Sequence, residues 1–193
     1  AVCDVAHEAG VAVHLDGARI FNAAVALEVP VMELTRDVDD ASFCLSKSLS
    51  CPVGSVLVGS KDFISEARRW RKMVGGGMRQ AGILAAAGLV ALDTMVDRLA
   101  EDHQNARRLA AGLANIDGLS VDADSIQTNI VIFDVDEKVA KVPDFMKALV
   151  DAEVLVSYPG EHSVRMVTHR HISGDDVEEA LSRTSKVVRE LQG

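Results

Sequence analysis

The sequence predicts an α/β fold, in which a sheet of buried strands is followed by a smaller α+β unit. Two observations support this prediction. Short β-branched runs alternate with amphipathic stretches over the first 60 residues and again after residue 117. The residues between them have an almost uninterrupted helical pattern. A chain of 193 residues, 48% hydrophobic and 25% charged, has the size and composition of one large globular domain or two small ones.

The first part of the chain reads as a helix and a strand, then a second helix and two more strands. The spacing of apolar and turn-forming residues predicts, in order, a helix over 2–9, a strand over 11–15, a turn over 16–19, a helix over 20–29 and strands over 41–47 and 54–60. A region with helical pattern follows over 61–116, interrupted only by three glycines at 75–77.

The second part alternates strands and helices. We expect strands over 119–123 and 128–135, a helix over 142–153 with Pro143 in its first turn, strands over 154–160 and 163–169, and a closing helix over 173–192 capped by Ser173. One long helix, from about Arg79 to Ala114, is predicted to join the two parts. The predicted domains are therefore residues 1–97 and 98–193.

Charge and composition restrict the partners. A net charge of -9 and an isoelectric point near 5.1 oppose binding to nucleic acid or to an anionic membrane surface. No apolar run reaches the roughly 20 residues of a spanning helix. Three cysteines without metal-ligand spacing indicate a reducing, cytoplasmic location and no metal site. A small molecule is the expected partner.

The start of the chain is unusual. The segment AVCDVAHEAG has helical spacing from its second residue and lacks both an initiator methionine and a signal-peptide pattern. We therefore expect the sequence to be the C-terminal part of a longer protein.

Asp16 and Lys47 are the first pair of residues that could carry chemistry. Asp16 follows the predicted strand 11–15, and Lys47 ends the predicted strand 41–47. In α/β sheets ligands bind beyond the carboxyl ends of the strands, so the two side chains could share one site. A lysine that forms a Schiff base and a carboxylate that keeps a pyridine nitrogen protonated both suit pyridoxal phosphate. A solvated salt bridge is the alternative that the spacing leaves open.

Four segments in order carry a resemblance to a known family: HLDGARIFNAA, SFCLSKSL, PVGSVLVGS and RKMVGGGMRQAGILAAAGLVAL. Together they closely resemble the low-specificity L-threonine aldolases, members of the β-eliminating lyase group within the aspartate-aminotransferase fold. The resemblance implies the PLP-dependent transferase fold type I, with the end of the large sheet domain followed by a small α+β C-terminal domain. It also implies pyridoxal 5'-phosphate as cofactor, β-hydroxy-α-amino acids such as threonine and allo-threonine as substrates, and a homodimer or homotetramer.

The resemblance assigns roles to four of the residues. Lys47 would be the Schiff-base lysine and Asp16 the partner of the pyridine nitrogen. Arg19 resembles the arginine that binds the substrate carboxylate, and Arg165 the second arginine, contributed by the small domain. Two guanidinium groups on one carboxylate give oriented, bidentate hydrogen bonds that lysine cannot make. For each arginine a surface charge is the alternative.

Lys72 and Arg79 stand on either side of the three glycines. In the resembling family this segment lies near the cofactor phosphate and in part reaches the neighbouring subunit. Glycines let backbone amides approach an anion closely, which fits such a role. A simple break between helices is the alternative.

The sequence departs from the resembling family near the lysine. Ser48 and Ser50 stand where the family has glycines, Cys51 replaces a small alanine, and Glu28 replaces a glycine at a helix end. If either glycine near the lysine has a positive φ, a serine there costs on the order of 1 kcal/mol and could lower activity.

The histidines are interpreted as structural. His14 lies within an apolar strand and is expected to be a hydrogen-bonded core residue, while His169 and His171 lack metal-ligating neighbours. The catalytic base is expected upstream of Ala1, on the resemblance alone. Two alternatives to a threonine aldolase stay open: another enzyme of the same fold, such as an aminotransferase or a tyrosine-phenol or tryptophan lyase, and a catalytically incompetent chain.

Overall fold

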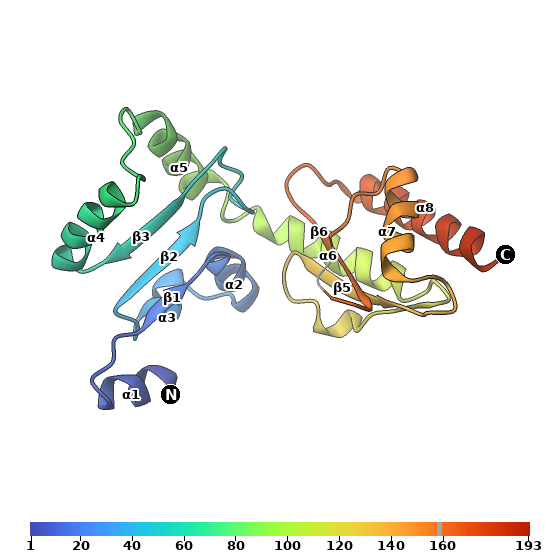
Figure 1. Cartoon of the computed structure of the whole chain (residues 1–193), viewed down its shortest axis with the longest axis horizontal. Helices are drawn as coiled ribbons and strands as arrows, with labels where there is room; N and C mark the ends of the chain where they lie inside the picture. Colours follow the sequence, from blue (N-terminus) through green and yellow to red (C-terminus); the bar gives the residue numbers. More distant parts are fainter. Residues whose placement is uncertain (158–159) are drawn as a thin grey trace. The chain divides into compact units, whose positions relative to one another are not determined.

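The computed structural model describes residues 1–157 and 160–193, and the chain divides into two compact units, Ala1–Leu99 and Ala100–Gly193 (Figure 1). Each unit has its own three-stranded sheet. The division lies two residues after the predicted boundary. Among the described helices, none is long and apolar enough to cross a membrane.

The first unit is built on a sheet in the order β1-β2-β3. The strands are β1 (His14–Asp16), β2 (Asp40–Cys44) and β3 (Ser55–Gly59). Strands β1 and β2 are parallel, whereas β3 is antiparallel to β2. The helices of this unit are α1 (Val2–Glu8), α2 (Ile20–Leu27), α3 (Val31–Thr35), α4 (Lys61–Met73) and α5 (Gly82–Thr94).

The core of the first unit holds the loop that follows β2. Leu45, Leu49 and Cys51 of this loop are buried together with Ala91 and Leu99. Gly88 of α5 allows the close packing, because a Cβ at that position would lie 3.1 Å from Leu45 Cδ1. Burial also raises the pKa of the Cys51 thiol, which therefore stays protonated at neutral pH.

The long helix predicted over 79–114 is wrong, because α5 ends at Thr94 and a turn precedes α6 (Leu99–Leu113). Thr94 Oγ1 donates a hydrogen bond to the Val90 carbonyl at 2.7 Å, which perturbs the helix end. The turn brings Met95, Val96 and the fully buried Leu99 against the core of the first unit. Apolar burial therefore outweighs the favourable helical pattern of this segment.

The second unit packs three helices on one face of an antiparallel sheet in the order β4-β5-β6. Residues 131, 133 and 135 of β5 are buried, while the residues between them face away from the core. The elements are α6, β4 (Leu119–Ser120), a 3₁₀ turn (Ala123–Ser125), β5 (Ile130–Val135), α7 (Val142–Asp151), β6 (Ser163–Val167) and α8 (Gly174–Gln192). Helices α7 and α8 lie side by side (Figure 1).

Two predictions for the second unit need correction, and one is confirmed. The 3₁₀ turn shortens the strand predicted over 119–123, and the strand predicted over 154–160 is reduced, in its described part, to one bridge between Ser157 and Arg165. Tyr158 and Pro159 of that predicted strand lie outside the described residues. Ser173 caps α8 as predicted, in a capping box with Asp176.

His103 on α6 is a buried titratable group, only 2% exposed. Desolvation, aided by the nearby Arg107 charge, lowers the pKa of His103 below its ordinary value. The unfolded chain therefore binds more protons than the folded chain in the pH range just below the ordinary pKa of about 6.5.

We predict that the free energy of unfolding of the second unit falls as the pH is lowered from 7.5 through 6. The stability conferred by neutral His103 is present above the ordinary histidine pKa and is lost below it. Urea titrations over this pH range, monitored by circular dichroism, check this result. His103→Gln should flatten the pH dependence, whereas the exposed His171→Gln should leave it unchanged; an equally steep dependence in His103→Gln contradicts the assignment.

Candidate active site

Lys47 lies on the loop that follows β2, and residues before and after it in the sequence are buried. Its side chain is exposed, whereas Leu45, Ser48 and Leu49 are buried. The Cys51 N–H donates to the Leu45 carbonyl at 3.0 Å and closes the loop. Within the described part of the chain, Lys47 Nζ has no hydrogen-bond or ion-pair partner. The sequence thus places a free primary amine at the tip of a firmly anchored loop.

The loop contains a residue with left-handed backbone geometry. The Ser50 N–H donates to the Lys47 carbonyl at 2.9 Å, which forms a tight turn, and Ser50 has a φ of 62°. Ser48 is not among the residues with positive φ. Glu28, where the resembling family has a glycine, also has a positive φ of 55° at the C-cap of α2. Two of the departures from that family therefore place a side chain where glycine is favoured.

Asp16 is the last residue of β1, on the same edge of the sheet as the Lys47 loop. Because β1 and β2 are parallel, their carboxyl ends point the same way, and the loop leaves β2 only three residues before Lys47. The Asp16 carboxylate is exposed and accepts a hydrogen bond from the Ala18 N–H at 3.2 Å. The carboxyl ends of the two strands are neighbours, as predicted, but the prediction that Lys47 ends a strand is wrong, because β2 ends at Cys44 and Lys47 lies on the loop that follows.

Asp16 and Arg19 line the same shallow cavity, which has a volume of about 280 Å³. Arg19 occupies the N-cap position of α2 and is half-buried. The Gly17 N–H donates to the Ser42 carbonyl at 2.8 Å, which holds the turn between the two residues. A Cβ on Gly17 would lie 3.0 Å from that carbonyl oxygen, so the close turn requires glycine.

Arg165 is placed on the open face of the sheet in the second unit. It lies on β6 opposite Ile132 of β5, and its side chain is exposed. Arg165 Nε donates to Ser157 Oγ at 2.9 Å, while backbone hydrogen bonds join the same two residues. Within the described residues the two terminal nitrogens of the guanidinium have no partner. The hydrogen bond from Nε to Ser157 thus orients the guanidinium group and leaves its two terminal nitrogens available to bind an anion.

Lys72 and Arg79 are exposed on either side of the glycine run. The glycines end α4: the Gly75 N–H donates to the Lys72 carbonyl, and the Gly76 N–H donates to the Arg71 carbonyl. With Gly75 at a φ of 89°, this is a Schellman motif. The helix-break interpretation thus explains Gly75 and Gly76, and the phosphate role of Lys72 and Arg79 stays a prediction.

The prediction that His14 is a core residue is wrong. Its side chain is 49% exposed, because His14 lies on the same face of the sheet as the exposed Asp16. It is nevertheless hydrogen-bonded, as expected: Nδ1 contacts the Asp40 carboxylate, and Nε2 lies 3.5 Å from Ser42 Oγ. An alternating pattern of polar residues at 14, 16, 40 and 42 was the sequence signal for this polar face.

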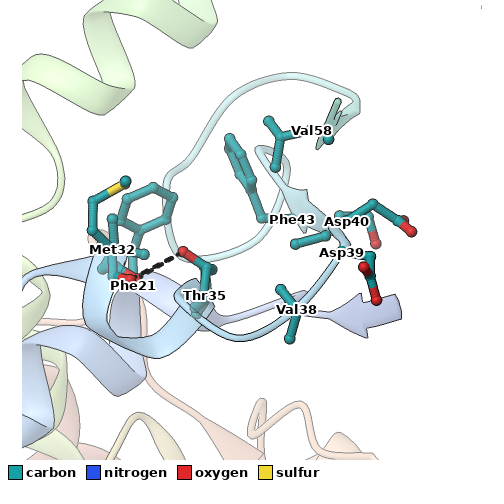
Figure 2. A pocket seen from close by; sticks show the side chains of 13 residues that line it. Phe21, Met32, Thr35, Val38, Asp39, Asp40, Phe43 and Val58 are labelled. Carbon is teal, nitrogen blue, oxygen red and sulfur yellow. Dashed lines mark hydrogen bonds between the residues drawn. The ribbon is translucent and has the colours of Figure 1, made fainter. Parts of the chain in front are cut away.

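A larger apolar cavity, of about 390 Å³, lies elsewhere in the first unit. Figure 2 shows the rings of Phe21 and Phe43 at this cavity, with the carboxylates of Asp39 and Asp40 at its edge. The two rings meet edge to face, with centroids 5.2 Å apart. None of the predicted site residues lines this cavity.

Together these features define a class of protein. The chain has the fold of the pyridoxal-phosphate-dependent enzymes of fold type I, as a comparison with solved structures shows. A serine palmitoyltransferase from Sphingomonas wittichii matches with a TM-score of 0.72 and 20% identity, over 98% of this chain and 50% of that one. The Oryza sativa protein TDC, solved with PLP and tryptamine, matches with a TM-score of 0.74 and 19% identity, over 100% of this chain and 45% of that one.

The chain belongs to the beta-eliminating lyase family, whose sequence profile matches residues 1–137. It is 46% identical over 176 residues to the low specificity L-threonine aldolase of Escherichia coli O157:H7, covering 91% of this chain and 50% of the relative. It is 39% identical over 192 residues to the low-specificity L-threonine aldolase 1 of Arabidopsis thaliana, covering 99% and 54%. The chain thus spans about half the length of these curated relatives.

We predict that Ser50→Gly raises the free energy of unfolding by about 0.5–1 kcal/mol, because glycine relieves the left-handed backbone strain. Ser48→Gly, two residues away, is the comparison and should lower it by at least about 0.5–1 kcal/mol, because it adds backbone freedom and also removes a buried side chain. Chemical denaturation of both variants measures the difference. Equal effects of the two substitutions would show that the backbone at residue 50 is not strained.

Proposed function

We propose that this chain is part of a pyridoxal-phosphate-dependent lyase that cleaves L-threonine, L-allo-threonine and related β-hydroxy-α-amino acids to glycine and an aldehyde. Membership of the beta-eliminating lyase family and the similarity to threonine aldolases over nearly the whole chain support the proposal. The observation that carries it is the free amine of Lys47 on an anchored loop, at the same sheet edge as Asp16. In this proposal residues 1–97 belong to the cofactor-binding domain and 98–193 form the small domain.

The residues of the first unit fit the chemical needs of pyridoxal phosphate. Lys47 offers an exposed amine for covalent attachment, and Asp16 offers an exposed carboxylate for a protonated ring nitrogen. When bound, the cofactor supplies an electron-withdrawing ring that accepts the electrons of the bond broken at the amino-acid α-carbon. Lys72 and Arg79 are the proposed cationic contacts of the phosphate group.

Arg19 and Arg165 are the proposed ligands of the substrate carboxylate. Arg19 shares a cavity with Asp16, and Arg165 is oriented by Ser157 so that its forked end is free. A carboxylate held by planar guanidinium groups has a fixed orientation, which determines the bond at the α-carbon that can break. The threonine hydroxyl proton must leave during the cleavage, and no described residue is assigned as its acceptor.

A second copy of the chain is the proposed macromolecular partner, in a homodimer or homotetramer. Helix α5 is apolar on all sides, yet Ile83, Leu89 and Val90 are 61–80% exposed. Trp70 and Met73 of α4 are exposed as well. A surface of this kind is typical of a protein interface. Three free cysteines also support the proposed cytoplasmic location.

We predict that the full-length protein, supplied with pyridoxal phosphate and threonine, produces glycine and acetaldehyde in equal amounts. Lys47→Ala should lower the rate by at least about a hundredfold, because the attachment point of the cofactor is lost. Lys61→Ala, which removes another exposed lysine of the same unit, should leave the rate unchanged. Separate assays of glycine, acetaldehyde, ammonia and pyruvate measure the outcome.

The same assay distinguishes the alternatives. Ammonia and pyruvate without glycine would indicate a β-eliminating lyase of another specificity. Transfer of the amino group to an added keto acid would indicate an aminotransferase. Absence of every product, with no cofactor bound, would indicate a catalytically incompetent protein.

We predict that Arg165→Lys raises the KM for threonine about tenfold, the cost of replacing a bidentate hydrogen bond to a charged group by a single contact. The value of kcat should change less. Steady-state kinetics of the full-length protein check this split, with the exposed Arg170→Lys as the control. An unchanged KM in Arg165→Lys would show that Arg165 does not bind the substrate carboxylate.

A further inference from the structure

Side-chain contacts among His14, Asp40 and Ser42 join β1 and β2 next to Asp16. We call these three residues the polar clasp. The carboxylate of Asp40 on β2 contacts Nδ1 of His14 on β1. The other ring nitrogen, His14 Nε2, lies 3.5 Å from Ser42 Oγ on β2. The parallel register places His14 opposite Asp40 and Asp16 opposite Ser42. The clasp therefore crosses between the strands twice and ends at the residue beside Asp16.

The carboxylate of Asp40 determines how His14 uses its two nitrogens. Asp40 is only 11% exposed, and a carboxylate accepts hydrogen bonds, so Nδ1 of His14 is the donor to it. In the neutral ring Nε2 is then the acceptor and the Ser42 hydroxyl donates to it. Ser42 thus donates to His14, and His14 donates to Asp40, so that the two contacts hold the imidazole ring in one orientation.

Ser42 also holds the turn that follows Asp16. Its carbonyl accepts the Gly17 N–H at 2.8 Å, while its hydroxyl is engaged by His14. The backbone on both sides of Asp16 is thereby tied to β2: His14 before it by the side-chain contacts, and Gly17 after it by the backbone bond. On this fixed strand end the Ala18 N–H, which donates to Asp16 Oδ1 at 3.2 Å, gives the carboxylate its direction.

We propose that His14 is a positioning residue, which acts through Ser42 and Asp40 to fix the Asp16 carboxylate for the cofactor ring. This inference rests on the proposed function, since Asp16 has a partner to meet only if the cofactor binds. The role is orientation, because the described contacts of His14 are with Asp40 and Ser42 and not with Asp16 itself.

The chain offers a matched control in a second histidine–aspartate pair. His7 Nε2 lies 2.9 Å from Asp39 Oδ2, and both side chains are about half exposed, much like His14. His7 lies on α1, away from the strand end that carries Asp16. Substitutions of His7 and His14 by phenylalanine thus remove the same kind of contact, only one of which belongs to the clasp.

The test uses the full-length protein, titrated with pyridoxal phosphate. The dissociation constant is measured by absorbance, the covalent adduct at Lys47 by borohydride reduction and mass spectrometry, and cofactor orientation by visible circular dichroism. His14→Phe should raise the dissociation constant about tenfold, as loss of outer contacts does at metal ligands, and change the visible dichroism. Ser42→Ala should raise it about threefold, the worth of one hydrogen bond, and His7→Phe should leave it unchanged.

The outcomes separate the two proposals. If the parent protein forms no adduct at Lys47, the proposed function and the positioning role both fail. If the parent forms the adduct but His14→Phe binds with the same affinity and dichroism, only the positioning role is overturned. Equal losses in His7→Phe and His14→Phe overturn it too. Should His14→Phe fail to fold, Ser42→Ala decides, and parent-like binding by that variant overturns the role.

Discussion

The burial of Leu45, Leu49 and Cys51 holds the loop on which the candidate site depends. These three side chains flank Lys47 and pack against Ala91 and Leu99, and the missing side chain of Gly88 leaves room for Leu45. An isolated charged residue in an apolar segment is thereby explained: the apolar residues around it are buried, whereas Lys47 itself is exposed. Apolar packing of this kind fixes an amine in place without any contact to the amine itself.

The sequence predicted much of the fold and the neighbourhood of the site. Short β-branched and apolar runs predicted the strands, although β1 begins at His14 and not at residue 11 as predicted. The parallel β1 and β2 bring the ends at Asp16 and Cys44 to the same edge of the sheet. The break at Thr94 could not be predicted, because it depends on the tertiary burial of Leu99. The exposure of His14 was missed although the sequence carried a signal for it, the alternating polar residues of the two strands.

The sequence showed at which positions the chain departs from the family pattern, but it did not show the backbone conformation at those positions. Only the structure shows that Ser50 and Glu28 have positive φ whereas Ser48 does not. Backbone geometry follows from how a turn closes, here by the Ser50 N–H bond to Lys47, and a residue type other than glycine gives no signal of it. The sequence alone could therefore place the backbone strain near Lys47 only somewhere within residues 48–50.

The open face of α5 has a consequence for handling the protein. A helix with Ile83, Leu89 and Val90 exposed is a surface to which other apolar surfaces adhere, including those of unrelated proteins. High concentration and high sulfate, which strengthen apolar association, would drive precipitation of the separated chain. Low protein concentration and moderate ionic strength are therefore the conditions that limit aggregation through this helix.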